Sequence, residues 1–109
     1  MEDQRIYEKI GQLLINACPA AAEKVIVRAK IFPEGDGATY EFDYVDGNEV
    51  TRWFDPPARK IGELTELLVC LQKEFINDEL VNEARIWREC EIKLDTKSSK
   101  IGINFSYND

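Results

Sequence analysis

The chain has 109 residues, 44% of them hydrophobic, and its 21 acidic and 14 basic residues give a net charge of −7. This length suits one domain with one hydrophobic core, spanning residues 1–109, and the acidic balance excludes phosphate-seeking nucleic-acid binders while favouring a basic protein as partner. No apolar stretch reaches the ~18 residues of a membrane helix, and the charged N-terminus lacks a signal-peptide pattern, so we expect a cytoplasmic protein with no membrane partner.

Residues 3–18 are predicted to form an amphipathic helix, because apolar residues recur on one face at helical spacing and Pro19 ends the pattern. Residues 24–32 alternate and are rich in β-branched side chains, which predicts a strand. The inward-facing side chains of this strand are Val25, Val27, Ala29 and Ile31. A turn of proline, glycine and acidic residues follows at 33–37.

Residues 33–55, which we call the acidic hairpin segment, hold nearly all of the net charge. Seven acids stand against one base, Arg52, which gives −6 and leaves −1 for the other 86 residues. The acids are Glu34, Asp36, Glu41, Asp43, Asp46, Glu49 and Asp55. Two strand-like runs, Ala38–Val45 and Glu49–Phe54, flank Asp46-Gly47-Asn48, and this pattern predicts a β-hairpin.

The aromatic side chains Tyr40, Phe42 and Tyr44 share one face of the first run, whereas its acids lie on the other. The facing of the second run depends on the loop, since a shift of one residue inverts a strand. With a two-residue loop, the odd-numbered residues of the second run, Trp53 among them, join the aromatic face. With a three-residue loop, the even-numbered residues, Phe54 among them, do so, and the sequence leaves both registers open.

A second helix is predicted from about Arg59 to at least Phe75, with Asp55 before it as a candidate N-cap. Its apolar stripe, spaced 3, 4, 3, 4, is Ile61, Leu64, Leu68, Leu71 and Phe75. Residues 87–95 and 100–107 alternate and form a second predicted hairpin. The order α-β-β-β-α-β-β predicts an α+β fold with a five-stranded antiparallel sheet and two helices packed on one face.

The sequence has no histidine, so it lacks the commonest general base and the commonest transition-metal ligand. The sequence has three cysteines, an odd number, and they lie far apart at Cys18, Cys70 and Cys90. We therefore expect buried, reduced thiols without a disulfide or a zinc site. Gly35-Asp36-Gly37 lacks the third glycine of a dinucleotide fingerprint. We therefore expect no cofactor, no metal and no catalytic residue.

One carboxylate pair nevertheless fits a hydrolase. Glu41 and Asp43 stand two apart on a predicted strand, roughly 6–7 Å from each other by strand rise, within the range of glycosidase pairs. No other reactive group accompanies them, which favours a solvated outer face of the sheet. Trp53, whose facing is undetermined, is the best candidate among the aromatic residues for a partner-binding anchor.

Several segments are typical of one protein family. They include Ile6-Tyr7 and Ile10 in the first helix, the run EKVIVRAKIFPEGDGATYEFDY, the helix ELTELLVCLQKEF, Trp87, and the closing CEIKLDTKSSKIGINFSYND with Phe105, Tyr107 and Asp109. With these features the chain resembles the YezG-like family of immunity proteins over most of its length. The turn Thr96-Lys97-Ser98-Ser99 departs from the Asp-Gly-like turn usual in that family.

The resemblance implies a protein without enzymatic activity, an antitoxin in bacterial competition. Members of the family neutralise polymorphic toxins, often nucleases, that contact-dependent or specialised secretion systems deliver between bacteria. The implied partner is the C-terminal domain of a cognate toxin. The family supplies no site residues.

An acidic surface can cover the basic, phosphate-holding surface of a nuclease. Our candidate toxin-binding residues are Glu34, Asp36, Glu41, Asp43, Asp46, Glu49, Trp53 and Asp55. The alternatives are a small adaptor or regulatory subunit that binds a basic protein, and a carboxylate-dependent hydrolase that uses Glu41 and Asp43.

Overall fold

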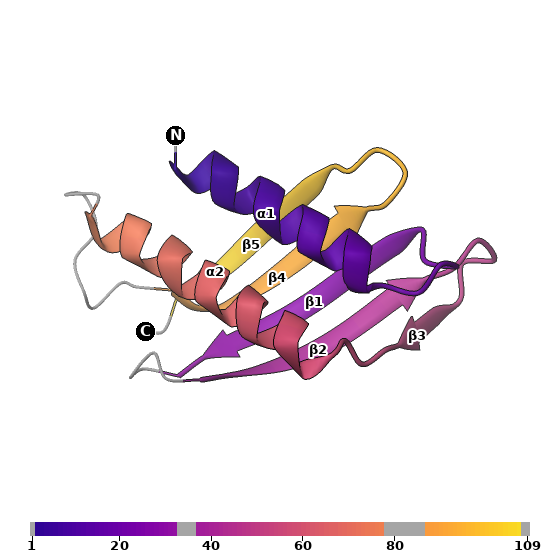
Figure 1. Ribbon diagram of the computed structural model, residues 1–109, viewed down its shortest axis with the longest axis horizontal. Coiled ribbons are helices and arrows are strands. Elements are labelled where there is room, and N and C mark those ends of the chain that lie inside the picture. Colours follow the sequence, from indigo (N-terminus) through magenta and orange to yellow (C-terminus); the bar gives the residue numbers. More distant parts are fainter. Residues whose placement is uncertain (1, 33–36, 78–86, 108–109) are drawn as a thin grey trace.

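The computed structural model describes residues 2–32, 37–77 and 87–107. It confirms the predicted α+β class and the order α-β-β-β-α-β-β, with a five-stranded antiparallel sheet and both helices on one of its faces (Figure 1). The elements are α1 (Glu2–Ala17), β1 (Lys24–Ile31), β2 (Ala38–Val45), β3 (Thr51–Trp53), α2 (Ala58–Asn77), β4 (Trp87–Asp95) and β5 (Ile101–Tyr107). Within these residues no helix is both long and apolar enough to cross a membrane.

The strands lie in the order β3-β2-β1-β4-β5, so β1 occupies the centre. In the antiparallel ladders, Val27 of β1 lies opposite Phe42 of β2 and Ile92 of β4. Residues opposite each other in a ladder share a face of the sheet. The period-2 pattern of each strand therefore directs its apolar side chains to the side that the helices cover.

The hydrophobic core fills the space between the helices and the sheet. Fully buried core residues come from both helices and from β1 and β4, among them Ile10, Leu14, Leu64, Leu68, Leu71, Val25, Val27 and Ile92. Helix α1 lies over the β4–β5 side, since Gly11 faces the side chains of Leu94 and Ile101. Of the predicted α2 stripe, Ile61 is only half-buried, and the side chain of Phe75 lies outside the described residues.

A polar contact ties α2 to the sheet as well. The Thr65 hydroxyl donates to the Ile61 carbonyl oxygen at 3.0 Å, so the Tyr40 hydroxyl is the donor in its own 2.7 Å bond to Thr65 Oγ1. Burial raises the pKa of Tyr40 to about 12, because desolvation penalises the phenolate. The neutral, donating phenol therefore persists across the physiological pH range.

The first hairpin has a three-residue loop. Asp46 N donates to Val50 O at 3.1 Å and Glu49 N donates to Asp46 O at 3.0 Å, which encloses residues 47–49 in a tight turn. Glu49 has a φ of 63°, in the left-handed region, where such loops place their last residue. Because its backbone is not extended, Glu49 does not pair in the ladder, and β3 is shorter than the predicted Glu49–Phe54.

Two smaller expectations are corrected. Helix α2 begins at Ala58, and the Pro57 carbonyl accepts from Ile61 N at 3.1 Å, so Asp55 lies two residues before the cap position and does not cap the helix. All three cysteines are free, but Cys70 is exposed and Cys18 half-buried, and only Cys90 is buried as predicted. Cys70 follows Leu68 by about 200° around the helix, which turns it away from the core.

The register of α2 can be tested at Leu68, which has no exposed surface. Replacing Leu68 by alanine should lower the free energy of unfolding by about 2–5 kcal/mol, because the cavity lies in the centre of the core. Glu66→Ala, at an exposed site on the same helix, should change it by less than ~0.5 kcal/mol. Urea denaturation measures both, and an equally small loss for Leu68→Ala would contradict this helix register.

Candidate functional site: the open face of the sheet

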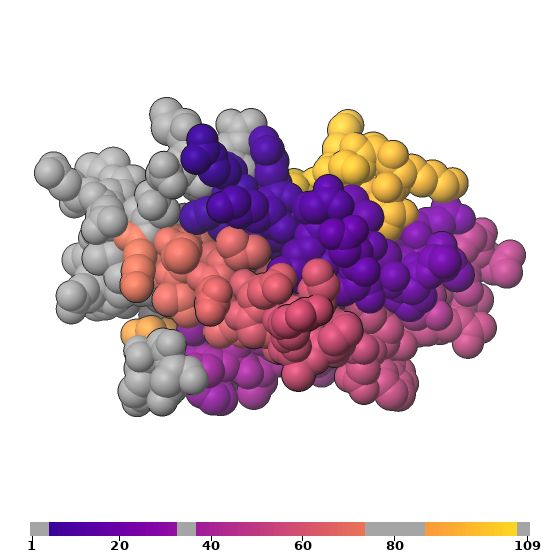
Figure 2. Space-filling view, in the orientation of Figure 1, coloured from indigo at the N-terminus to yellow at the C-terminus, as the bar shows by residue number. Residues whose placement is uncertain are grey.

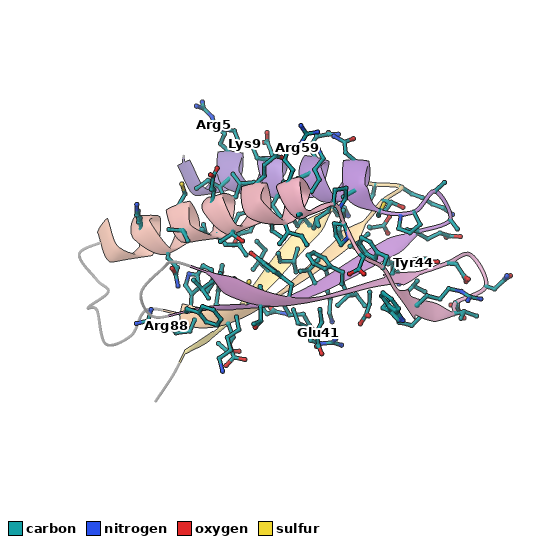
Figure 3. The ribbon with its side chains drawn as sticks, turned by 60° about the horizontal axis from the view of Figure 1, so that its bottom comes forward. Arg5, Lys9, Glu41, Tyr44, Arg59 and Arg88 are labelled. Atoms are coloured by element: carbon teal, nitrogen blue, oxygen red, sulfur yellow. The ribbon has the colours of Figure 1, made fainter. Side chains whose placement is uncertain are left out.

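No described residue covers the face of the sheet opposite the helices, which we call the open face. Figure 3 shows Glu41 projecting from this side, whereas Arg5, Lys9 and Arg59 project from the helical side. Figure 2 shows the helical side, where α1 and α2 form a continuous covering layer. Three hollows of about 920, 460 and 260 Å³ are lined by strand residues of this side, among them Lys24, Arg28 and Glu41, and the largest is lined by residues of both hairpin loops as well. The outward side chains of β1 to β5 therefore form a wide surface that a partner can reach.

Arg28 stands at the centre of this surface, on the middle strand β1. Its Nη1 lies 3.4 Å from Glu41 Oε1 and 3.2 Å from Asp43 Oδ2, and its Nε lies 3.5 Å from Glu91 Oε2. The ladders explain the arrangement, because Arg28 is opposite Glu41 on one side and Glu91 on the other. Three carboxylates therefore share one guanidinium, and we call these four residues the Arg28 cluster.

The Arg28 cluster changes the charge of the predicted site. Counted along the sequence, residues 33–55 carry −6, but Glu41 and Asp43 pair with a base from outside that segment. Both signs of charge alternate across the outward positions of β1, β2 and β4. The acids there are Glu41, Asp43, Glu89, Glu91 and Asp95, and the bases are Lys24, Arg28, Lys30 and Lys93. The open face is thus nearly balanced, and the exposed carboxylates Glu49 and Asp55 flank β3.

Trp53 lies on the open face, directly opposite Asp43 in the β2–β3 ladder. The three-residue loop sends Phe54 into the core beside Phe42 and leaves Trp53 with 74% of its surface exposed. A hollow of about 260 Å³ beside it is lined by Arg28, Asp43 and Asp55 among others. The largest exposed aromatic side chain of the described residues therefore stands next to carboxylates at the edge of the sheet.

The remaining candidates occupy the loop and its neighbours. Asp46 Oδ1 accepts hydrogen bonds from the backbone N–H groups of Asn48 at 2.9 Å and Val50 at 3.1 Å, and Arg52 Nε lies 3.5 Å from Asp46 Oδ2. Asp46 thus holds the loop in shape. Glu49 and Asp55 are exposed. Glu34 and Asp36 lie outside the described residues.

The second hairpin repeats this construction at the same end of the sheet. Asp95 Oδ1 accepts from the backbone N–H groups of Lys97 at 2.9 Å and Ser98 at 3.2 Å, and Ser99 has a φ of 59°. Thr96 N donates to Glu23 O at 3.0 Å, which ties this loop to the start of β1. Sequence reasoning missed the hydrogen bond that ties this loop to β1, and it did not include Arg28 in the candidate site. The outward position of Arg28 on a predicted strand was the available signal.

The geometry argues against hydrolysis by Glu41 and Asp43. A glycosidase needs one of its two carboxyl groups kept protonated, usually by an apolar enclosure. Here the Glu41 side chain is 72% exposed, and both carboxylates lie against the Arg28 guanidinium. The described residues also contain no group of three or more potential metal-ligating His, Cys, Asp or Glu side chains.

The loop makes a pH dependence testable. The backbone N–H donors of Val50 and Asn48, with Arg52 beside them, hold the pKa of Asp46 below its usual range. A carboxyl group whose folded-state pKa is depressed stabilises the fold above its unfolded-state pKa of about 3.9, and that contribution disappears as the pH falls through the folded-state value. Asp46→Asn should therefore be less stable than wild type at pH 7, and the difference should shrink in acid.

Denaturation at a series of pH values between about 2 and 7 measures this difference, with the carboxyl carbon resonance of Asp46 as a direct readout of its titration. A stability difference that is the same at every pH would show that the carboxylate charge does not hold the loop.

The sequence model of the family described as "YezG-like: Immunity protein YezG-like" matches residues 4–109. No curated protein matches the chain.

Proposed function

This chain belongs to the family of YezG-like immunity proteins, and we propose that it neutralises a cognate antibacterial toxin domain by binding it with the open face and the β2–β3 hairpin. We further propose that the toxin is a nuclease whose basic active-site surface is covered in the complex. The proposal names a protein partner and requires no cofactor, no metal and no catalytic residue. A single basic partner would account for both the exposed Trp53 and the carboxylates near it.

The observation that carries the proposal is the exposure of Trp53. A tryptophan side chain with 74% of its surface in water would be stabilised by the hydrophobic effect if a partner covered it. Tryptophan is also enriched among the few residues that supply most of the energy of an interface. Its place on the edge strand, beside a hollow lined by Asp43 and Asp55, gives an apolar anchor with an acidic rim.

The carboxylates supply the complement to a basic partner. Glu49 and Asp55 flank β3 and are exposed, and the Arg28 cluster has three carboxylates for one guanidinium. Arg28 limits the repulsion among these anions in the free protein. Lys93 Nζ already lies 3.7 Å from Glu91 Oε1. A lysine or arginine of a nuclease can add a further cation beside Glu41 and Asp43, and opposite potentials accelerate the encounter of the two proteins.

A small adaptor that binds a basic protein would use the same surface. The two roles differ in the partner and in the outcome, because only an immunity protein abolishes the activity of the toxin in proportion to the amount added. A titration of the toxin domain with this chain, read out by nuclease activity, separates them. An inhibition that ends at one chain per toxin domain supports the proposed function.

The anchor is tested by Trp53→Ala. We expect the toxin domain to bind at least tenfold more weakly, since truncation of a central interface residue commonly costs 2 kcal/mol or more. Val50→Ala, a second exposed apolar residue of the same hairpin but on its other face, is the matched control and should bind as the wild type does. Isothermal titration calorimetry measures both affinities. Wild-type affinity for Trp53→Ala, in a variant of unchanged melting temperature, would remove Trp53 from the interface.

The charges are tested by the double variant Glu49→Lys and Asp55→Lys. These two acids are chosen because Asp46 holds the loop and Glu41 and Asp43 pair with Arg28. We expect slower association with the toxin domain at low salt and a weaker dependence of the rate on ionic strength. The control, Glu63→Lys with Glu66→Lys, makes the same change of charge at exposed sites on α2.

Stopped-flow kinetics at several salt concentrations measure these rates. If the hairpin variant and the α2 control associate equally fast at every salt concentration, the hairpin charges are a solvated edge and the toxin binds elsewhere.

A further inference from the structure

The hollow beside Trp53, which we call the Trp53 hollow, has the size and charge of a site for one side chain. Its volume of about 260 Å³ lies below the ~300–1,000 Å³ typical of small-molecule pockets. Three carboxylates line it, those of Glu41, Asp43 and Asp55, and one guanidinium, that of Arg28. Three negative charges and one positive charge leave a formal charge of −2. A cationic side chain of a protein partner therefore suits this hollow better than an anion does.

The strand register places two of the carboxylates around the indole. Asp43 lies directly opposite Trp53 in the β2–β3 ladder, where the Cβ atoms of paired residues are about 4.5–5.5 Å apart. The pairing continues past the end of β3, because Phe54 N donates to a β2 carbonyl oxygen at 3.0 Å. Pro56 disfavours helical backbone at Asp55, so Trp53 and Asp55, two apart, project from the same face of the chain. One carboxylate therefore lies across from the indole and another lies beside it.

The contacts of Arg28 leave these carboxylates able to accept a further cation. Its Nη1 lies 3.4 Å from Glu41 Oε1 and 3.2 Å from Asp43 Oδ2, farther than the ~2.7–2.9 Å of close charge-assisted hydrogen bonds. Each of these contacts uses one of the two oxygens of its carboxylate, and an ionised carboxylate has about four lone-pair sites. Glu41 and Asp43 therefore retain acceptor capacity for donors of a partner, and Asp55 is exposed beside them.

The indole determines which cation fits best. A cation above the face of an aromatic ring is attracted by the quadrupole of that ring, and tryptophan is the strongest such acceptor. A guanidinium is planar, so it can stack on the indole of Trp53 while its N–H groups donate to carboxylates at the edge of the ring. The ammonium of lysine is compact and strongly hydrated, and it has no flat face to stack. An exposed indole between Asp43 and Asp55 is thus matched to arginine.

We propose that the Trp53 hollow binds the side chain of one arginine of the toxin, with the guanidinium stacked on the indole and hydrogen-bonded to Asp43 and Asp55. This inference rests on the proposed function for the identity of the partner, and it narrows the partner's basic surface to one residue type at this position. Trp53 then acts through the face of its ring and not only through its apolar area. Arginine is also enriched among the residues that supply most of the energy of interfaces.

Short peptides test the site without the toxin. Three capped tripeptides with arginine, lysine or leucine between two glycines are titrated against the full chain at low ionic strength. The readout is the indole N–H resonance of Trp53, which the variant Trp53→Phe assigns, since the chain has two tryptophans. We expect the arginine peptide to bind roughly threefold more tightly than the lysine peptide, and Asp55→Asn to weaken its binding by a similar factor. The control Glu66→Gln, exposed on α2, should bind as the wild type does.

The complex with the toxin domain gives a second readout. Trp53→Tyr keeps an aromatic ring at this position, whereas Trp53→Leu keeps an apolar side chain without one. We expect Trp53→Tyr to bind the toxin domain roughly tenfold more tightly than Trp53→Leu, because a stacked cation desolvated in an interface is worth more than an exposed one. Equal affinities of these two variants overturn the arginine site and make Trp53 a purely apolar anchor. Peptides that bind equally well with arginine, lysine and leucine overturn it too.

These outcomes separate the arginine site from the proposed function. Inhibition that ends at one chain per toxin domain, without any preference for arginine, overturns the site and leaves the proposed function intact. A preference for the arginine peptide, without inhibition of the toxin domain, supports the site and overturns the proposed function.

Discussion

The strict alternation of the central strand β1 is the constraint on which both the core and the candidate site depend. Its inward residues Val25 and Val27 are fully buried and lie between β2 and β4. Its outward residue Arg28 lies between carboxylates of those same two strands. A slip of one residue in β1 would put a guanidinium into the core and valines into water. The energy of apolar burial therefore fixes the position of the Arg28 cluster, which exposed ion pairs alone would fix only weakly.

A second constraint acts at the first hairpin, where the loop decides which of two adjacent aromatic residues reaches the surface. The loop leaves Phe54 beside Phe42 and Tyr44 and turns Trp53 outward. A loop with one residue fewer would exchange them. Glu49 holds a left-handed conformation that costs a non-glycine residue roughly 1 kcal/mol, and the hydrogen bonds to Asp46 offset that cost. An acid that the sequence suggested as a binding residue thus also determines where the anchor lies.

The sequence predicted the fold where the signals are local and periodic. The strands at Ala38–Val45 and Trp87–Asp95 have the predicted bounds, because alternation over eight or nine residues is unambiguous. The sequence did not decide between a two-residue and a three-residue loop in the first hairpin, since both lengths fit the same composition. Cys70 was expected to be buried, as unpaired cysteines usually are, but its angle around the helix turns it away from the core. In each case the deciding quantity is an angle or a register that only the assembled sheet and helix define.

The candidate site shows why charge counted along a segment differs from charge on a surface. The excess of acids in residues 33–55 was real as a count, yet the neighbour in space of Glu41 and Asp43 is Arg28 of another strand. A count of charges along one segment misses ion pairs that form between strands, and these pairs reduce the excess charge in the middle of the sheet. The proposed binding role therefore assigns the affinity to Trp53, because screened and partly paired carboxylates contribute mainly to the rate and selectivity of encounter. In the proposed complex the two are therefore complementary, since the carboxylates would favour the approach of a basic partner and the exposed indole would supply the affinity for it.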